Sequence, residues 1–332
     1  MDPLSQGIVG AVAAQQPSKK GQLLIVTIVG FLSGMAPDID IFFRSDEDPL
    51  LYFEFHRQFT HSLIFIPFGG LICATIFYNL FLRKKNISFR QTYICATLGY
   101  ATHGLLDSST SYGTQLFWPF TDERVAWNLI SIIDPIFTIP LLILVIFAMI
   151  KNNKTYSYLS LLWITIYMSF GFIQKDRAEI IGKQIASSRG HIIEKIEAKP
   201  SFANSIVWKI IYTTKSSYHI DAVKLGFDTK IYEGTTIKKL SLSESYPWLN
   251  PLSQQAIDVE RFRWFSNGYL AKSTTMPNQI LDVRFSVLPN EGHGLWGIEL
   301  NPNGDMKEHV KTISNRKRNL KTYQKLWRMI ID

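Results

Sequence analysis

Cysteine is scarce in this chain, with only 2 residues among 332. Cys73 and Cys95 both lie within apolar stretches. A disulfide-stapled fold needs several cysteines, and the usual structural zinc sites need clustered thiolates, so both classes are excluded. We interpret the two cysteines as small apolar residues that fill space between helices.

Charge is also scarce, since 19% of the residues are charged and 46% are hydrophobic. The charged residues are unevenly distributed, because apolar runs dominate up to about residue 174 and polar residues are frequent from Lys175 onward. This division predicts a multi-spanning α-helical membrane domain at residues 1–174, followed by a smaller α+β extramembrane domain at 175–310. Residues 311–332 are predicted to form a basic amphipathic helix.

Five apolar segments are predicted in the first part, at residues 23–35, 63–82, 92–106, 129–150 and 156–173. The second, fourth and fifth have the length that a helix needs to cross a bilayer, which is about 20 residues. The first and third are shorter, and on length alone either is a crossing or a re-entrant helix. Residues 1–16 have no basic n-region, so we expect no cleavable signal peptide and a retained first segment.

Basic residues decide the predicted topology, because Lys and Arg are retained in short cytoplasmic loops. They occur before the first segment, between the second and third, and between the fourth and fifth: Lys19, Lys20, Arg83, Lys84, Lys85, Arg90, Lys151 and Lys154. If these loops are cytoplasmic, the chain crosses about five times. The C-terminal domain then lies on the periplasmic or extracellular side of the cell (inner) membrane.

Three clusters of acids and histidines fall at the ends of these apolar segments: PDID at 37–40, HRQFTHS at 56–62 and HGLLD at 103–107. The predicted topology places all three on the outer face. Ionisable groups at a bilayer boundary are costly, so their grouping indicates a metal site rather than chance.

The individual clusters leave alternatives open. His103 and Asp107 are four residues apart and share one helical face, a spacing that suits either two ligands of one ion or a hydrogen bond at a helix end. His56 and His61 flank a helix start, where Thr60 is a possible cap. Asp38 and Asp40 follow Pro37 in a turn, and isolated acids of this kind are often solvated loop residues or caps.

Together the clusters supply six candidate ligands, namely Asp38, Asp40, His56, His61, His103 and Asp107. This mixed nitrogen and oxygen set suits a divalent metal, with zinc first and manganese or iron as alternatives, and it has enough ligands for two ions. Asp38 or Asp107 is a candidate catalytic base. Arg57 either pairs with an acid of the site, binds an anionic substrate oxygen or contacts a lipid headgroup.

Aromatic residues are frequent between the third and fourth segments, at Tyr112, Phe117, Trp118, Phe120 and Trp127. Such residues anchor proteins at membrane interfaces, and here they can also guide an amphiphilic or lipid-linked substrate. Membrane lipids are therefore the expected partners.

The second part alternates like antiparallel strands at 207–213, 219–227, 230–237, 280–288 and 295–300, with helices at 176–188 and 251–265. His191, His219, His293 and His309 lack ligand spacing and are taken as surface or structural residues. The net charge is +8, but the chain has no nucleic-acid motif, and no nucleic-acid partner is expected. An apolar stripe of Leu320, Tyr323, Trp327 and Ile330 among basic residues is typical of a helix that binds anionic membrane.

Several ordered sequence blocks resemble those of a known family: MDPLSQGIVGA, APDID, HRQFTHSL, HGLLDSSTSYGTQLFWPF and the DP in NLISIIDPIF. They resemble the YdjM/YbcI-type membrane-bound metal-dependent hydrolases. The similarity of that family to zinc-dependent phospholipase C and to nuclease-type helical metalloenzymes implies phosphoester hydrolysis. Gln6 stands where many relatives have histidine, which implies a second-shell role or a lost ligand. Asp134 matches the family's Asp-Pro pair, which implies ligation or a second-shell role, yet an Asp before Pro135 also fits a helix N-cap.

The resulting prediction is a membrane metallohydrolase in which metal-activated water attacks a phosphoester at the periplasmic or extracellular face of the membrane. The alternative is a non-enzymatic membrane scaffold with a structural metal site and a partner-binding external domain. An open coordination position favours the enzyme, whereas four protein ligands favour the scaffold. The sequence predicts no oligomeric state.

Overall fold

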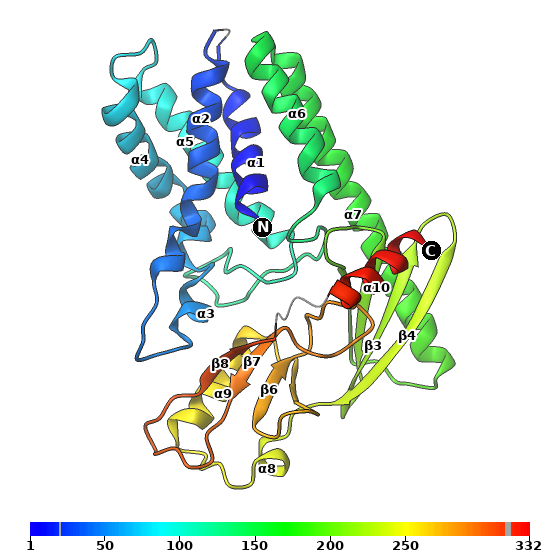
Figure 1. The fold of residues 1–332 in the computed structure, drawn as a ribbon. Coiled ribbons are helices and arrows are strands. Elements are labelled where there is room, and N and C mark those ends of the chain that lie inside the picture. The colour runs from blue at the N-terminus through cyan, green and yellow to red at the C-terminus, as the bar shows by residue number, and fades with distance from the viewer. Residues whose placement is uncertain (20, 316–319) are drawn as a thin grey trace. The chain divides into compact units, whose positions relative to one another are not determined.

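A computed structural model describes residues 1–19, 21–315 and 320–332 (Figure 1). Lys20, one of the predicted cytoplasmic basic residues, lies outside these ranges. The chain divides into two compact units, which are described separately. The first unit contains residues Met1–Phe42, Phe55–Phe172 and Phe202–Asn204, and the second contains Phe43–Glu54, Ile173–Ser201 and Ser205–Asp332.

The first unit is helical and is organised around α1 (Pro3–Gln15), a helix that the sequence analysis did not predict. Asp2 caps it by accepting a hydrogen bond from the Ser5 backbone nitrogen, and most of its residues are buried. α1 runs beside α2 (Leu23–Met35), whose bounds are those predicted. The two backbones approach closely at Gly30, where an added Cβ would lie 2.5 Å from the Gly10 carbonyl oxygen. Small residues of this kind allow tight helix contacts in membranes.

The other helices of this unit pack beside this pair, and α5 contacts both of its members. α4 (Ile66–Phe77) continues as a π-helix (Tyr78–Leu82), and α5 (Phe89–Ser108) begins at the Ser88 cap. α6 (Pro135–Lys151) starts later than the predicted segment at 129–150, because Asp134 caps it and Pro135 occupies its first position. α7 (Lys154–Ser188) is one continuous helix over the two segments predicted at 156–173 and 176–188.

Apolar helices long enough to cross a bilayer are found at Leu23–Phe42, Leu63–Leu82 and Lys154–Ser188, and Pro135–Lys151 is apolar but shorter. Their outward faces carry exposed apolar side chains, among them Leu24, Ile28, Phe68, Ile72, Ile139, Ile143, Leu162 and Ile166. Polar side chains are instead buried between helices, as at Ser5, Gln15, Thr27 and Ser160. The outward faces of these helices are therefore apolar, while polar side chains lie among the apolar residues of the interior.

Three helix connections meet at one end of this bundle (Figure 1). The Gly21 nitrogen donates to Asn152 Oδ1 at 3.0 Å, the Gln22 amide donates to the Asn86 carbonyl, and Lys154 Nζ donates to the Gln16 carbonyl. The α1–α2, α4–α5 and α6–α7 connections are therefore joined. The three acid/histidine clusters lie at the opposite end, after α2, before α4 and at the end of α5.

The second unit contains two antiparallel four-stranded sheets. The first sheet has the order β1-β2-β3-β4, with strands at Lys195–Pro200, Val207–Thr213, Ser217–Leu225 and Thr229–Lys238. The C-terminal part of α7 packs on this sheet through Ala178, Ile185 and Ala186, which contact Trp208, Ile210 and Tyr212.

The second sheet has the order β5-β6-β7-β8, with strands at Leu270–Lys272, Gln279–Asp282, Trp296–Glu299 and Lys311–Ser314. The helices of this unit are α3 (Leu51–Phe55), α8 (Leu242–Ser245), α9 (Gln254–Phe265) and α10 (Leu320–Ile331). Two predictions are corrected here. The strand predicted at 280–288 ends at Asp282, and the helix predicted at 311–332 begins only at Leu320, since residues 311–314 pair with β7. Residues 316–319 of that predicted helix lie outside the described residues.

Candidate metal centre

Each cluster is positioned by the end of a helix. α2 ends at Met35, but the chain continues through Pro37 as a 3-10 helix (Ala36–Phe42). Asp38 and Asp40 therefore lie on this helix, which corrects the turn predicted for them. A second short 3-10 helix (Phe59–His61) ends at His61. Its Thr60 does not act as the predicted helix cap, since Thr60 Oγ1 donates to Asp40 Oδ2 instead. His103 and Asp107 occupy the last turns of α5.

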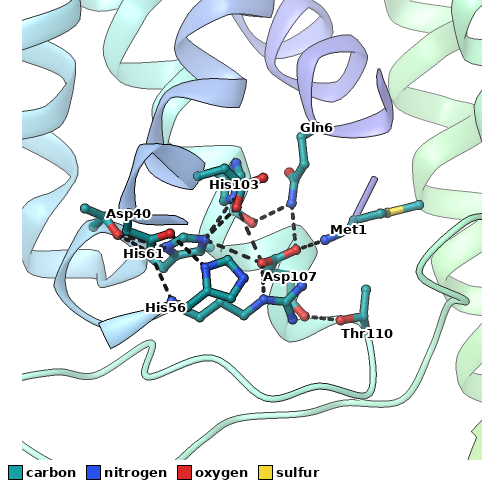
Figure 2. A network of polar contacts seen from close by, with 12 residues as sticks. Met1, Gln6, Asp40, His56, His61, His103, Asp107 and Thr110 are labelled. Atoms are coloured by element: carbon teal, nitrogen blue, oxygen red, sulfur yellow. Dashed lines mark hydrogen bonds and ion pairs between the residues drawn. The ribbon is translucent and has the colours of Figure 1, made fainter. Parts of the chain in front are cut away.

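The rings of His61 and His103 face each other across the site (Figure 2). Their Nε2 atoms are 2.9 Å apart, and both side chains are fully buried. His103 Nδ1 lies 2.6 Å from the Gly34 carbonyl oxygen, which can only accept, so Nδ1 carries the proton and Nε2 presents a lone pair.

His61 is oriented in the same way by a carboxylate. Its Nδ1 lies 3.2 Å from Asp40 Oδ2, so this nitrogen is a donor and Nε2 again points into the site. Two nitrogen lone pairs at 2.9 Å repel unless a proton or a cation lies between them. The geometry of the two rings therefore fits a cation site.

Two carboxylates complete this group. Asp38 Oδ1 lies 3.5 Å from His61 Nε2 and 3.3 Å from His103 Nε2, and Asp107 Oδ2 lies 3.6 and 3.9 Å from the same atoms. Tetrahedral ligands about 2.1 Å from one ion are about 3.4 Å from each other. The observed separations of 2.9–3.9 Å bracket this value. Asp38, His61, His103 and Asp107 could thus hold a metal ion.

Asp40, which the sequence predicts as a metal ligand, is surrounded by hydrogen-bond donors of the protein. Its Oδ1 contacts His56 Nδ1 at 2.7 Å, and its Oδ2 accepts from the Arg57 nitrogen at 3.0 Å and from Thr60 Oγ1 at 2.9 Å, in addition to the His61 contact. Donors from the protein occupy both oxygens, so this arrangement orients His61 and His56. Asp38, Asp40 and His56 also form a second group that could hold an ion, but only if these contacts are exchanged.

Asp107 is held by three groups besides the histidines. The Met1 α-amino nitrogen contacts Oδ1, Gln6 Nε2 donates to the same oxygen at 2.8 Å, and Arg57 Nε contacts Oδ2 at 2.9 Å. Gln6 thus lies beside a ligand candidate, which is the second-shell position implied by the family resemblance. In the described part of the chain, Gln6 Oε1 is buried without a hydrogen-bond partner. This amide oxygen therefore has a lone pair available beside the four ligand candidates.

Arg57 is buried with its guanidinium at the site. Its backbone has a positive φ of 67°, a conformation that costs energy for a side chain of this size and that recurs at functional sites. The guanidinium lies 5.2 Å from the centre of the Tyr112 ring. Among the described residues, Nη1 has no hydrogen-bond partner although it is buried. A buried guanidinium nitrogen of this kind is suited to bind an oxyanion.

Two histidine pKa values are displaced in opposite directions. Burial lowers the pKa of His56, although the hydrogen bond to Asp40 opposes this effect. Burial also disfavours the charged form of His61, but hydrogen bonds to Asp38 and Asp40 outweigh it and raise the pKa of His61. Metals bind neutral imidazole, so the raised pKa of His61 makes protons stronger competitors for this ligand position.

Asp134, the other predicted second-shell residue, lies away from this group. Its Oδ1 accepts from the Phe137 nitrogen at the start of α6, and its Oδ2 accepts from the Tyr167 hydroxyl at 2.8 Å. Of the two alternatives for Asp134, this geometry is capping.

Three groups at this site were not predicted from the sequence: the Met1 amino group, the Gly34 carbonyl and Tyr112, whose ring lies against Arg57. None of them has a side-chain type or spacing that indicates a metal site. Main-chain atoms give no motif, and Tyr112 was assigned to the interfacial aromatic residues. Only the path of the chain brings them together.

Comparisons with known proteins agree with the sequence blocks. The chain is 27% identical over 210 residues to the uncharacterized protein YfhP of Bacillus subtilis (strain 168), covering 63% of this chain and 61% of YfhP. It is 30% identical over 116 residues to the inner membrane protein YbcI of Escherichia coli (strain K12), covering 31% of this chain and 60% of YbcI. The chain thus spans about three-fifths of the length of these relatives.

No solved structure matches the chain. The model of a family described as YdjM inner membrane protein matches residues 1–178, which is more than half of the chain and includes every residue of the candidate metal centre. This match confirms the family resemblance and supports a membrane location. The chain belongs to the YdjM inner membrane protein family.

Proposed function

We propose that this protein is a membrane-bound, metal-dependent hydrolase that cleaves a phosphoester, with zinc as the preferred ion. The observation that carries the proposal is the convergence of the His61 and His103 Nε2 atoms with Asp38 and Asp107 at tetrahedral ligand spacing. Two imidazoles and two carboxylates suit zinc, and they suit manganese or iron less closely. A bound divalent ion would supply Lewis-acid charge for water and for the phosphoryl oxygen.

Residues around the ion would bind the phosphoryl group and accept a proton from water. Arg57 would hold a phosphoryl oxygen through Nη1 while its Nε stays on Asp107. Asp38 is the most open ligand candidate, with its side chain 25% exposed against 0% for Asp107, so it is the better placed carboxylate to accept a proton from water. His56, with its side chain 19% exposed, lies at the outer edge of the group and is held by Asp40.

The arrangement of the first unit supports a crossing topology. We propose that α2, α4, α5, α6 and α7 cross the membrane as predicted, and that α1 adds a crossing inside the bundle, because Met1 contacts Asp107 at the metal centre while the α1–α2 connection lies at the opposite end. The three joined connections include Arg83, Lys84, Lys85 and Lys154 and would be cytoplasmic by the distribution of positive charge. The metal centre and the C-terminal domain would then lie on the periplasmic or extracellular side.

A lipid-linked or other amphiphilic phosphoester is the substrate class that this location favours. Phe117 and Phe120, in the loop between α5 and α6, are exposed, Phe120 to 81%. The same loop contacts the site, since the Gln115 nitrogen donates to the Arg57 carbonyl at 2.9 Å. An amphiphile that contacts these rings at the membrane interface would be near the candidate anion-binding group.

A structural metal site remains the second candidate, and one observation favours it. Four protein side chains at tetrahedral spacing fill the coordination sphere of zinc, which is typical of structural rather than catalytic sites. A catalytic site would require one of the four, most readily the partly exposed Asp38, to give way to water or substrate.

Metal analysis of the detergent-purified protein is the first test. We expect stoichiometric metal in the wild type, loss in His61→Ala and in His103→Ala, and retention in Asp134→Asn, whose polar side chain keeps the α6 cap. Absorption spectra after cobalt substitution would then distinguish four protein ligands from a sphere that includes water. A folded wild type that binds neither zinc nor manganese would contradict the proposal. A metal-loaded protein that hydrolyses no phosphodiester or phospholipid would leave the structural role as the better account.

A further inference from the structure

The C-terminal helix α10 presents a second apolar strip besides the one that packs on its own domain. Leu326 and Met329 are buried against Val207, Ala222 and Leu288 of the second unit. The predicted stripe is therefore corrected at one position, since Ile330 packs toward this contact. Helix α10 is thus fixed on the domain by one face, and most of its other residues are exposed.

The exposed surface of α10 separates apolar from basic residues. Leu320, Trp327 and Ile331 follow one another at seven and four residues, which places them on one side of a helix, and they are 72%, 62% and 59% exposed. Lys321, Lys325 and Arg328 fall on the adjoining side by the same periodicity. An apolar strip bordered by cations is the arrangement of helices that lie in a membrane interface.

A hairpin extends this surface. The turn between β3 and β4 carries Phe227, whose side chain is fully exposed, and Lys224 and Lys230 pair across the strands beside it. Lys224 Nζ donates to the Ile331 carbonyl at 3.0 Å, and the Tyr232 hydroxyl donates to the Met329 carbonyl. The hairpin and the C-terminal end of α10 are therefore one surface, as their closeness in Figure 1 illustrates.

The charge of this surface identifies its partner. Its five basic side chains are Lys224, Lys230, Lys321, Lys325 and Arg328, and they outnumber the two acidic side chains, Asp228 and Asp332. Exposed Trp and Phe beside such charge fit the headgroup region of an anionic bilayer, where the rings enter the interface and the cations meet phosphate. The chain belongs to a membrane protein family, so its C-terminal domain is covalently linked to a region expected at a bilayer.

We propose that α10 and the β3–β4 turn form a docking surface for anionic phospholipid, which holds the C-terminal domain against the membrane. This role is independent of the metal centre. It requires that the surface contact lipid in a charge-dependent manner.

The test uses the full chain in nanodiscs. Gln324→Cys places an environment-sensitive fluorophore at the border between the apolar strip and the basic side, and the native Cys73 and Cys95 are buried and therefore protected from labelling. We compare nanodiscs of phosphatidylcholine with nanodiscs that contain about one-third phosphatidylglycerol. We expect brighter, blue-shifted emission and quenching by nitroxide lipids only with phosphatidylglycerol. Raising salt to about 1 M, where the Debye length falls to about 3 Å, should reverse the change.

Variants separate the two contributions. The double variant Lys325→Gln/Arg328→Gln should remove the dependence on anionic lipid, and Trp327→Ser should weaken the quenching, since neither change touches the buried face of α10. Leu252→Ser is the matched control, because Leu252 is an exposed apolar residue elsewhere in the second unit, and it should behave as the parent does.

Two results would overturn the proposal. One is identical emission in the two kinds of nanodisc. The other is an emission change that occurs already in detergent and grows with protein concentration, which would assign the surface to a second copy of the chain.

Discussion

Replacing Asp40 by Asn tests whether this carboxylate positions the metal ligands or is itself one of them. Asp40 contacts four donors through two oxygens, at 2.7–3.2 Å. Asn keeps one acceptor oxygen and places an NH₂ group where the other oxygen was. At least one donor must therefore lose its partner, and the negative charge that stabilises His61 is removed.

The expected effect is a partial loss of metal affinity. Removing a carboxylate that orients a ligating histidine lowers affinity about 10–100-fold, which corresponds to about 1.4–2.7 kcal/mol. Removing a ligand, as in His61→Ala, should abolish stoichiometric binding altogether. Competition against a chromophoric chelator at fixed pH would measure both effects on detergent-purified protein.

Two outcomes would refute the reasoning. If Asp40→Asn binds zinc as tightly as the wild type, the contact between Asp40 and His61 has no role in the site. If it binds none while remaining folded, Asp40 is a ligand, as the sequence alone suggested. Asp134→Asn is the matched control, because it changes another buried carboxylate of the same unit without touching the metal centre.

Three further changes have definite expectations. Gly104→Ala should lower metal affinity, because its Cβ would lie 2.1 Å from the His61 carbonyl oxygen and would displace that backbone; the same chelator competition checks it. Asp134→Ala should lower the stability of the helical unit by roughly 2 kcal/mol, through loss of the α6 cap and of the hydrogen bond from the Tyr167 hydroxyl, without metal loss; thermal unfolding in detergent measures it. Burial lowers the pKa of Lys209 to about 7, so between pH 7 and 10 the unfolded chain holds more protons and stability rises with pH. From pH 7 to 9 this contributes about 2 kcal/mol, a gain that unfolding curves should lack in Lys209→Met.

Local sequence rules predicted the features that depend on neighbouring residues. The bounds of α2 follow from an apolar run that ends before Pro37. His103 and Asp107 lie on the same face of α5 because they are four residues apart on one helix. The division between an apolar, helical first part and a second part with antiparallel strands also follows from composition.

Features that depend on tertiary contact could not be predicted. α1 was missed because it is enclosed by other helices, and it uses glycine, alanine and polar residues instead of a long apolar run. Asp40 and Asp38 are the same residue type two positions apart, and only the path of the 56–61 segment shows that donors surround Asp40. The start of α10 was misplaced because residues 311–314 gain their partners from β7, which lies 12 or more residues earlier in the chain.

The bond from His103 to the Gly34 carbonyl links the metal centre to the relative position of two helices. A helix rises about 1.5 Å per residue, so sliding α2 along α5 by one residue would break this 2.6 Å contact. Gly30, one turn before Gly34, sets how closely α2 approaches α1 and α5. The metal affinity that we propose for this group would therefore depend on helix register, and a bulkier residue at Gly30, which belongs to no ligand group, should weaken metal binding through the backbone alone.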